Sequence, residues 1–276
     1  RGGSPRAVAR LISLVENADP RLREVMAALA PHTGRARIIG LTGSPGVGKS
    51  IARDAAENLT PVTLELGGKS PALFFEDIFA KDDDFKQKAI EGFAMFALNQ
   101  GEICTCPSRA LVQESIADEF LELGVQRVKQ IKTGNPLDTE TMMGTQASAE
   151  QMNKIQEYLE IGPQEGAEVL TGGGVNTIEG LENGMYIEPT VFKGTNDMRI
   201  FQEEIFGPVL SVATFKDYDE AIAIANATNF GLGAGVWSRS QNICYRAGRD
   251  IQAGRVWVNH YHDYPAHSAF GGYKES

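Results

Sequence analysis

Apolar residues at helical spacing define the first part of the chain. Ser4 and Pro5 provide a capping hydroxyl followed by the ring that suits a first helical position, and a second helix is predicted after Asp19 and Pro20. The apolar positions of the two predicted helices are Val8, Leu11, Ile12 and Val15, then Leu22, Val25, Met26 and Leu29. Spacing of three and four residues places each set on one helical face, which predicts a helical hairpin that needs another surface to pack against.

A different pattern follows, in which short apolar runs alternate with helical segments. The runs predict strands at 38–41, 209–215, 235–237 and 254–258, and helices at 52–58, 84–98 and from Ser148 through Leu159. Ser148 and Gln151 have the spacing of a capping box. This alternation is typical of an α/β fold with a mostly parallel sheet. We expect a helical segment at 1–37, a strand, loop and helix unit at 38–64, and one larger domain at 65–276.

The composition indicates a soluble globular protein. The chain has 276 residues, 42% of them hydrophobic, and no apolar run approaches the roughly 20 residues that span a bilayer. The first ten residues lack the apolar stretch of a secretory signal, and three cysteines (Cys104, Cys106 and Cys244) make a poor disulfide framework. We therefore expect free thiols, a cytoplasmic location and no membrane partner.

Charge is distributed unevenly along the chain. The formal net charge is −10, which argues against a nucleic-acid partner because phosphate backbones are met by clustered Lys and Arg. Residues 1–50 hold eight basic and three acidic residues, the remainder holds 18 and 33, and all 22 aromatic residues follow position 50. This break predicts two origins for one chain, joined between Ser50 and Ile51.

The break coincides with a glycine-rich motif, G-S-P-G-V-G-K-S at residues 43–50. Between a strand and a helix, Gly43, Gly46 and Gly48 would let backbone N–H groups point inward, Lys49 would reach the outer phosphates and Ser50 would hold magnesium. With its Arg-rich lead-in, segment 1–50 resembles the start of the P-loop GTPases that chaperone methylmalonyl-coenzyme A mutase. The resemblance implies GTP or ATP with Mg²⁺ as a ligand.

The other elements of a GTPase site do not follow the motif. No Asp is followed three residues later by Gly, and the one Asn-Lys pair, Asn153-Lys154, continues with Ile155 and Gln156. The run A-L-F-F-E-D at 72–77 is interpreted as a core strand rather than a magnesium-binding strand end. We therefore expect weak GTP affinity. Two interpretations of the loop stay open: a working nucleotide site, or a phosphate-binding loop that lacks its supporting sheet.

Five sequence blocks after the junction resemble a second family, unrelated to the GTPases. They are E-L-G-G-K-S-P at 65–71, N-Q-G-E-I-C-T-C-P-S-R at 99–109, E-E-I-F-G-P-V at 203–209, G-R-V-W-V-N at 254–259 and F-G-G-Y-K at 270–274. In order and spacing these blocks, and the chain from about residue 51, resemble the catalytic portion of the aldehyde dehydrogenase superfamily. The resemblance implies that family's α/β catalytic domain, a small aldehyde as substrate and NAD or NADP as cofactor.

Four residues in these blocks match roles that the resemblance implies. Oxidation by hydride transfer first requires a tetrahedral adduct that can expel hydride, and a cysteine thiolate is suited to form it. Cys104 matches the family's nucleophile. Water must then clear the acyl thioester, and Glu65 matches the general base that activates it. Glu204 and Phe206 match the pair that holds the ribose and packs by the nicotinamide ring.

The end of the chain contains a loop that could line a substrate tunnel and three histidines that do not form a metal-binding pattern. The loop 271–274 matches the one that borders the substrate tunnel in the family. The nearby His260, His262 and His267 lack a Cys or carboxylate partner at fixed spacing, so we expect no metal site.

The resemblance covers only the later half of the dehydrogenase pattern. It lacks the earlier strands of the dinucleotide domain, an Asn that helps hold the oxyanion and a Lys that reaches the adenosine ribose. The chain stops at Ser276, before the strand through which family members form homo-oligomers. Losing one oxyanion donor typically costs about a hundredfold or more in rate. Three interpretations stay open: an impaired aldehyde dehydrogenase, a P-loop nucleotide binder, and a non-catalytic chimeric fragment.

Overall fold

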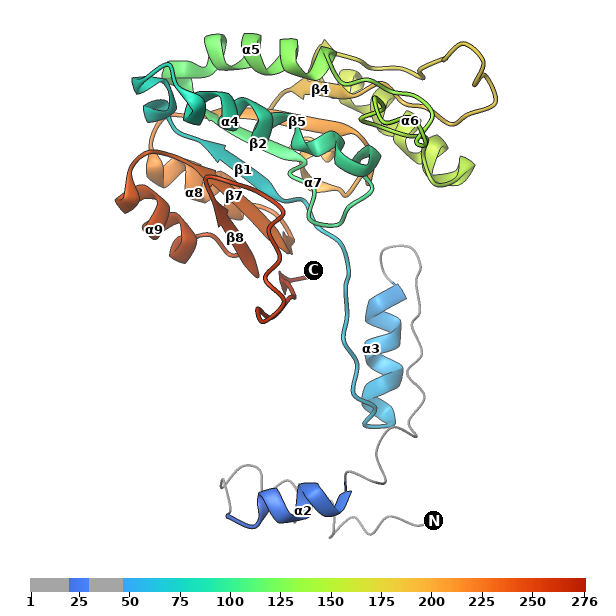
Figure 1. The fold of residues 1–276 in the computed structure, drawn as a ribbon, viewed down its shortest axis with the longest axis vertical. Helices are drawn as coiled ribbons and strands as arrows, with labels where there is room; N and C mark the ends of the chain where they lie inside the picture. The colour runs from blue at the N-terminus through green and yellow to red at the C-terminus, as the bar shows by residue number, and fades with distance from the viewer. Residues whose placement is uncertain (1–19, 30–46) are drawn as a thin grey trace. The chain divides into compact units, whose positions relative to one another are not determined.

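The computed structural model describes residues 20–29 and 47–276 (Figure 1). The chain divides into two compact units, Arg1–Ser44 and Pro45–Ser276. In the first unit the described helix is α2 (Leu22–Leu29), at the position that the apolar spacing predicts. The helix predicted from Ser4 and the strand predicted at 38–41 lie outside the described residues.

The second unit is built on a seven-stranded sheet of order β3-β4-β5-β2-β1-β7-β8, in which only the β3–β4 pair is antiparallel. Its strands are β1 (Pro71–Phe74), β2 (Arg109–Gln113), β3 (Glu168–Thr171), β4 (Thr190–Lys193), β5 (Val209–Phe215), β7 (Gly233–Trp237) and β8 (Arg255–Val258). A separate antiparallel pair joins β6 (Phe230–Gly231) to β9 (Tyr273–Lys274). The expected mostly parallel sheet is therefore confirmed.

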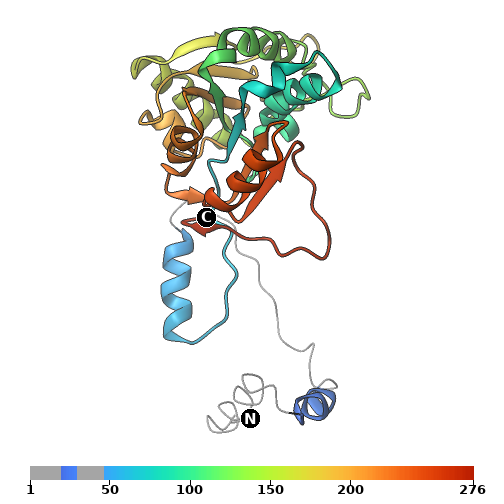
Figure 2. The same cartoon turned by 90° about the vertical axis from the view of Figure 1, so that its left-hand side faces the viewer.

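Helices cover both faces of this sheet (Figures 1 and 2). The helices packed on the sheet are α4 (Asp84–Ala94), α5 (Ala117–Lys129), α6 (Ala149–Gln164), α7 (Arg199–Gln202), α8 (Tyr218–Asn226) and α9 (Gln241–Asp250). Helix α3 (Val47–Glu57) precedes β1 in the chain, and none of its described side chains belongs to the two hydrophobic cores. Short 3-10 segments lie at Glu76–Ala80, Met95–Gly101 and Glu114–Ile116.

Alternation along β1 explains the two layers. Ala72 and Phe74 belong to the core beneath α4 and α5, whereas Leu73 belongs to the core that includes α6, α8 and α9. The rings of Phe74 and Phe120 lie 4.7 Å apart between β1 and α5. The run at 72–77 begins as the predicted core strand, which ends at Phe74, whereas Glu76 and Asp77 start a 3-10 turn that was not predicted.

Helix α6 agrees with its predicted start but not with its predicted end. The Ser148 hydroxyl accepts a hydrogen bond from the Gln151 N–H at 3.1 Å, as in a capping box. The Gln151 side chain does not return to Ser148, because it donates to the carbonyls of Ile205 (2.9 Å) and Phe206 (2.7 Å). The helix continues to Gln164 rather than ending at Leu159.

An ion pair ties the start of α4 to the end of β7 and predicts a pH dependence. Asp83 caps α4 and lies 2.6 Å from the Arg239 guanidinium, whose hydrogen bond lowers the pKa of that carboxyl from 3.8 to about 2. Folding depresses this pKa, so the ionised Asp83 carboxylate stabilises the folded state. This contribution to stability is complete above pH 3.8 and is lost as the pH falls through about 2.

We expect Asp83→Asn, which keeps a capping side chain, to melt at a lower temperature than the wild type at pH 6. The difference should shrink between pH 4 and pH 2, as measured by circular dichroism melting. Asp118→Asn, at an exposed position in the first turn of α5, is the control. A difference between Asp83→Asn and wild type that does not change with pH would contradict the assignment.

Candidate active site

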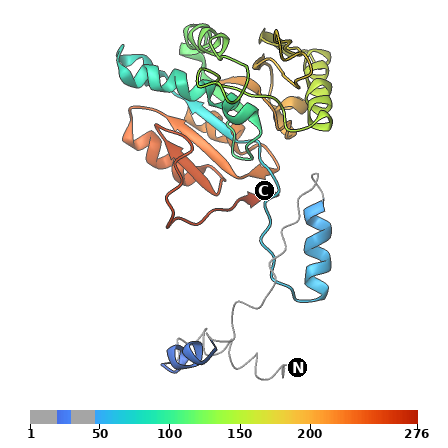
Figure 3. The same cartoon turned by 45° about the vertical axis from the view of Figure 1, so that its right-hand side comes forward.

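The four residues that match dehydrogenase roles lie in three loops that lead into neighbouring strands. Glu65 precedes β1, Cys104 precedes β2, and Glu204 and Phe206 precede β5. Strands β5, β2 and β1 are adjacent and parallel, so their amino ends lie at one edge of the sheet (Figure 3). Open α/β sheets usually bind ligands at the opposite, carboxyl edge.

The nucleophile loop follows an interrupted helix. Helix α4 ends at Ala94, earlier than the predicted 98, and passes into a 3-10 segment. Asn99, Gln100 and Gly101 have φ values of 49°, 48° and 74°, a left-handed conformation that helical periodicity does not encode. The turn leaves Cys104 half-buried, outside helix and strand.

A glycine turn joins the three loops. The N–H of Gly68 donates to the Glu204 carboxylate at 2.9 Å. A Cβ at Gly68 would lie 2.7 Å from the carbonyl oxygen of Cys104, and a Cβ at Gly67 would collide with the Glu204 carboxylate. Gly67 also has a φ of 96°. Glycine at these two positions therefore permits the Glu65 loop to approach both Cys104 and Glu204.

The electrostatics of the site favour a protonated thiol. Burial raises the pKa of Cys104, the charges of Glu65 and Glu204 raise it further, and the backbone N–H groups of Thr105 and Cys104 lower it. Glu65 is solvent-exposed, and partial desolvation raises the pKa of its carboxyl. A carboxylate with a raised pKa close to such a thiol can accept its proton and can later activate water.

The second cysteine of this loop faces the protein interior. Burial raises the pKa of Cys106 to about 12, and its Sγ donates to the Phe96 carbonyl at 3.3 Å. Reactivity follows the thiolate and its access to solvent, so Cys104 is the better nucleophile of the two.

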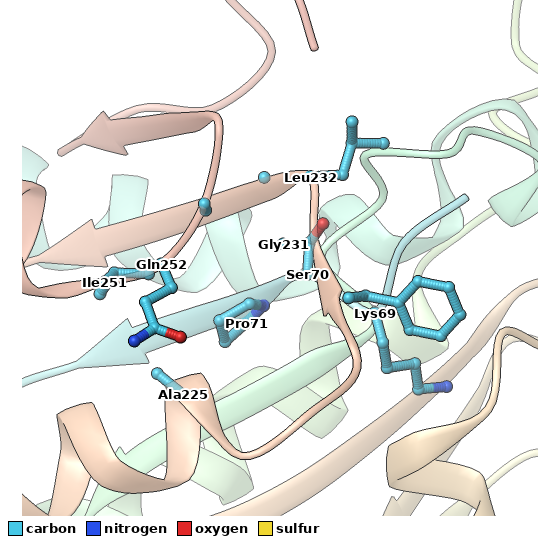
Figure 4. Close-up of a pocket in the computed structure, with 11 residues that line it drawn as sticks. Lys69, Ser70, Pro71, Ala225, Gly231, Leu232, Ile251 and Gln252 are labelled. Carbon is cyan, nitrogen blue, oxygen red and sulfur yellow. The ribbon is translucent and has the colours of Figure 1, made fainter. Parts of the chain in front are cut away.

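Lys69 is a site candidate that the sequence blocks did not single out. Its side chain is 1% exposed, and its Nζ finds no hydrogen-bond acceptor in residues 20–29 and 47–276. Burial and the Arg109 charge lower the pKa of Lys69 to about 7, although Glu204 opposes this. Figure 4 shows the Nζ directed away from the small pocket beside Pro71 and Gln252. A lysine in a glycine-rich turn resembles a surface residue, so no local signal reveals its burial.

Arg109 holds the neighbouring segments in place. Its fully buried guanidinium donates to the carbonyls of Lys69 (2.9 Å), Ile224 (3.0 Å) and Ala225 (2.8 Å) and to the Asn196 amide oxygen (2.8 Å). The cation thus sits at the carboxyl end of α8, where it complements the helix dipole. Arg109 links the start of β2 to the segment that leads into β1.

The last residues of the glycine-rich motif are helical. Gly48, Lys49 and Ser50 lie in the first turn of α3, and Gly43 lies outside the described residues. The Lys49 ammonium forms an exposed ion pair with Glu275 at 2.9 Å. Lys49 is therefore paired with a carboxylate of the C-terminal loop in this structure.

The Glu204–Phe206 loop fits the nicotinamide half of a dinucleotide cofactor. The Glu204 carboxylate accepts the Gly68 N–H at 2.9 Å and retains acceptor positions that ribose hydroxyls can use. Phe206 is half-buried with a φ of 60°, and its carbonyl is fixed by the Gln151 amide. A carboxylate acceptor followed by a rigid aromatic residue suits a ribose joined to a flat ring.

Neither a metal-binding cluster nor a membrane-spanning helix is found in the described ranges. No three His, Cys, Asp or Glu side chains gather there as a metal ion requires. Within the same ranges, no helix has the length and apolar character to cross a membrane.

Comparison with known sequences identifies relatives of the whole chain. The model of the aldehyde dehydrogenase family matches residues 9–276. The long-chain-aldehyde dehydrogenase of Acinetobacter sp is 67% identical over 238 residues, covering 86% of this chain and 47% of that protein. A probable aldehyde dehydrogenase of Mycobacterium tuberculosis is 56% identical over 282 residues, covering 99% of this chain and 56% of that protein. These matches lend no support to a GTPase origin for residues 1–50.

Solved structures share the fold as well as the sequence. HpcC of Thermus thermophilus has a TM-score of 0.80 at 40% identity, covering 86% of this chain and 46% of that one. Betaine aldehyde dehydrogenase of Staphylococcus aureus in complex with NAD+ has a TM-score of 0.80 at 39% identity, covering 85% and 46%. The chain spans about half the length of the curated relatives it matches. With sequence and fold in agreement, the chain belongs to the aldehyde dehydrogenase family.

Proposed function

We propose that the chain carries the catalytic centre of an NAD- or NADP-dependent aldehyde dehydrogenase, with Cys104 as nucleophile and Glu65 as general base. The observation that carries the proposal is the turn at Gly67 and Gly68, which packs against the Cys104 backbone and hydrogen-bonds Glu204. The family match and the NAD+ complexes of related structures support it. The small aldehyde substrate, self-association and the cytoplasmic location are further parts of the proposal.

Each proposed step assigns a proton or a bond to a residue. Glu65 accepts the thiol proton, directly or through water, and the Cys104 sulfur attacks the carbonyl carbon to give a thiohemiacetal. A bound nicotinamide supplies the hydride acceptor. The Glu65 carboxyl then releases its first proton to solvent. Water attacks the resulting thioester at Cys104 and gives a proton to Glu65, the C–S bond breaks as the carboxylic acid leaves, and the sulfur recovers that proton from Glu65 as the thiol re-forms. Glu204 and Phe206 position the cofactor against the sulfur.

We infer that the glycine-rich motif serves the dehydrogenase rather than a GTPase. Dehydrogenases of this family carry a G-S-x-x-V-G turn at the helix start under the cofactor pyrophosphate, and Gly43, Ser44, Val47 and Gly48 match it. The family match from residue 9 includes the motif, and Lys49 is paired with a carboxylate. No observation in the described residues favours GTP with Mg²⁺ or a non-catalytic chimera.

We expect Glu65→Gln to slow the cofactor-independent hydrolysis of p-nitrophenyl acetate by about 10²- to 10⁴-fold, the usual range for general-base catalysis. In the wild type the hydrolysis rate should rise with pH as the Glu65 carboxyl loses its proton. The midpoint of this rise should lie above pH 4.5, the ordinary pKa of Glu, because desolvation raises the pKa of Glu65. Release of p-nitrophenol followed across pH measures both effects.

Glu57→Gln, at an exposed position that ends α3, is the matched control and should keep the wild-type rate and pH profile. If Glu65→Gln retains the rate and the same rise with pH, Glu65 is not the base.

A further inference from the structure

One segment after β8 makes three polar contacts with the residue that follows the nucleophile. The Tyr261 hydroxyl donates to the Thr105 carbonyl at 2.9 Å. The Tyr264 hydroxyl and the Thr105 hydroxyl hydrogen-bond at 2.6 Å, and the Nε2 of His262 lies 3.5 Å from the same Thr105 oxygen. Thr105 is 1% exposed, so these contacts satisfy polar atoms that water does not reach.

Packing holds the segment against this loop. The rings of Tyr261 and Trp257 lie 4.4 Å apart, and the Trp257 indole N–H donates to the Asp263 carbonyl at 2.8 Å. Gly235 on β7 leaves the space for the Tyr261 ring, because a Cβ there would lie 2.8 Å from it. Tyr261 is thus fixed by β7 and β8 together, and burial raises its pKa well above 10, so its hydroxyl remains a donor at neutral pH.

We propose that Tyr261 and Tyr264 are positioning residues that hold Thr105 so that its backbone N–H faces the sulfur of Cys104. The inference rests on the proposed function of Cys104 as the nucleophile. One tyrosine fixes the Thr105 carbonyl and the other fixes its side chain, so the backbone of Thr105 cannot rotate freely. An N–H directed at the sulfur stabilises the thiolate by a charge-assisted hydrogen bond.

The other titratable groups around Cys104 do not stabilise its thiolate. Glu65 and Glu204 disfavour the thiolate by like charge. Among residues 20–29 and 47–276, other titratable side chains near this loop are Cys106, Tyr261, Tyr264 and His262. Burial lowers the pKa of His262, so that ring is neutral at pH 7.5 and adds no positive charge beside the sulfur. Backbone N–H groups therefore carry the stabilisation of the thiolate.

The test is the pH profile of Cys104 alkylation by iodoacetamide in the full chain, with fragment-ion mass spectrometry to separate Cys104 from Cys106. We expect Tyr261→Phe and Tyr264→Phe to move the profile to higher pH. At pH 7.5 the rate should fall by about three- to tenfold, because a thiol whose pKa rises by about one holds a tenfold smaller thiolate fraction below that pKa. At high pH all variants should reach the wild-type plateau.

Two further variants separate positioning from general damage. Tyr245→Phe, on a side chain 69% exposed in α9, should leave the profile unchanged. Thr105→Val removes the partner of Tyr264, so the double variant Thr105→Val/Tyr264→Phe should be no slower than either single variant. If Tyr261→Phe fails to fold, Tyr264 carries the test, because its side chain is 44% exposed.

Each outcome bears on a different claim. A wild-type Cys104 that iodoacetamide does not modify at any pH would overturn its role as nucleophile. A reactive Cys104 whose profile is unchanged in the folded Phe variants would overturn the positioning role alone. A lower plateau without a displacement along the pH axis would show a change of access and would also overturn it.

Discussion

The variant Cys104→Ala is expected to hydrolyse p-nitrophenyl acetate at least about a hundredfold more slowly than the wild type. Cys104 is half-buried where the turn at Gly67 and Gly68 meets the Glu204 loop, whereas Cys106 and Cys244 are buried. Alanine removes the atom that would carry the acyl group, so only background hydrolysis should remain. Initial rates of p-nitrophenol release at pH 8 measure the loss.

Cys244→Ala provides the matched cysteine control. Its Sγ donates to the Ser238 carbonyl at 3.5 Å, just beyond the carboxyl end of β7 and away from the loops that hold the predicted site residues, and burial raises its pKa. The control should keep its hydrolysis rate within about twofold if it remains folded. An unchanged rate in Cys104→Ala would assign the activity to another residue.

The variant Arg109→Met is expected to lose about 3 kcal/mol or more of the free energy of unfolding. It would remove the buried donor of the Lys69 and Ala225 carbonyls and of the Asn196 amide oxygen, and an unsatisfied buried polar group costs about 1–3 kcal/mol. The Ile224 carbonyl would still accept the Ala227 N–H at 3.2 Å. Relief from burying the charge, which lowers the Arg109 pKa to about 9, offsets part of the loss. Urea unfolding followed by tryptophan fluorescence measures the change.

Arg249→Met is the control for this prediction. Arg249 lies in the last turn of α9 with its side chain 67% exposed, so its replacement should change the unfolding free energy by less than about 0.5 kcal/mol. If Arg109→Met costs no more than Arg249→Met, the hydrogen bonds of Arg109 do not hold the start of β2.

Secondary structure was predictable where the local pattern is strong. The apolar run at 209–215 coincides with β5, whereas β7 begins at Gly233, two residues before its predicted start, because glycines carry little strand preference. The helix predicted at 84–98 ends at Ala94 and passes into a 3-10 segment, in which Leu98 is extended with a ψ of 134° before left-handed Asn99 and Gln100. Periodicity records which face is apolar, not where backbone dihedrals change sign.

The site was predictable as a set of loops but not as an arrangement. Motifs singled out Glu65, Cys104 and Glu204, but the strand after Cys104, β2 (Arg109–Gln113), was not predicted. Parallel pairing of β1, β2 and β5 brings the three loops to the same end of the sheet. Lys69 and Arg109 gave no signal, because their burial depends on segments distant in the sequence: the acceptors of Arg109 include Asn196, Ile224 and Ala225. The glycine-rich motif was ambiguous for another reason: the G-S-P-G-V-G-K-S pattern satisfies two kinds of phosphate-binding turn, and sequence alone did not separate them.

The central claim is that Cys104 carries the acyl group, and the most direct measurement is the position of that group. After brief incubation of the chain with p-nitrophenyl acetate, fragment-ion mass spectrometry locates the acetylated residue. We expect one acetyl group on the sulfur of Cys104, with a longer lifetime in Glu65→Gln because water is no longer activated to remove it. An acetyl group on Cys106 or on a lysine, with Cys104 unmodified in both proteins, would contradict the claim.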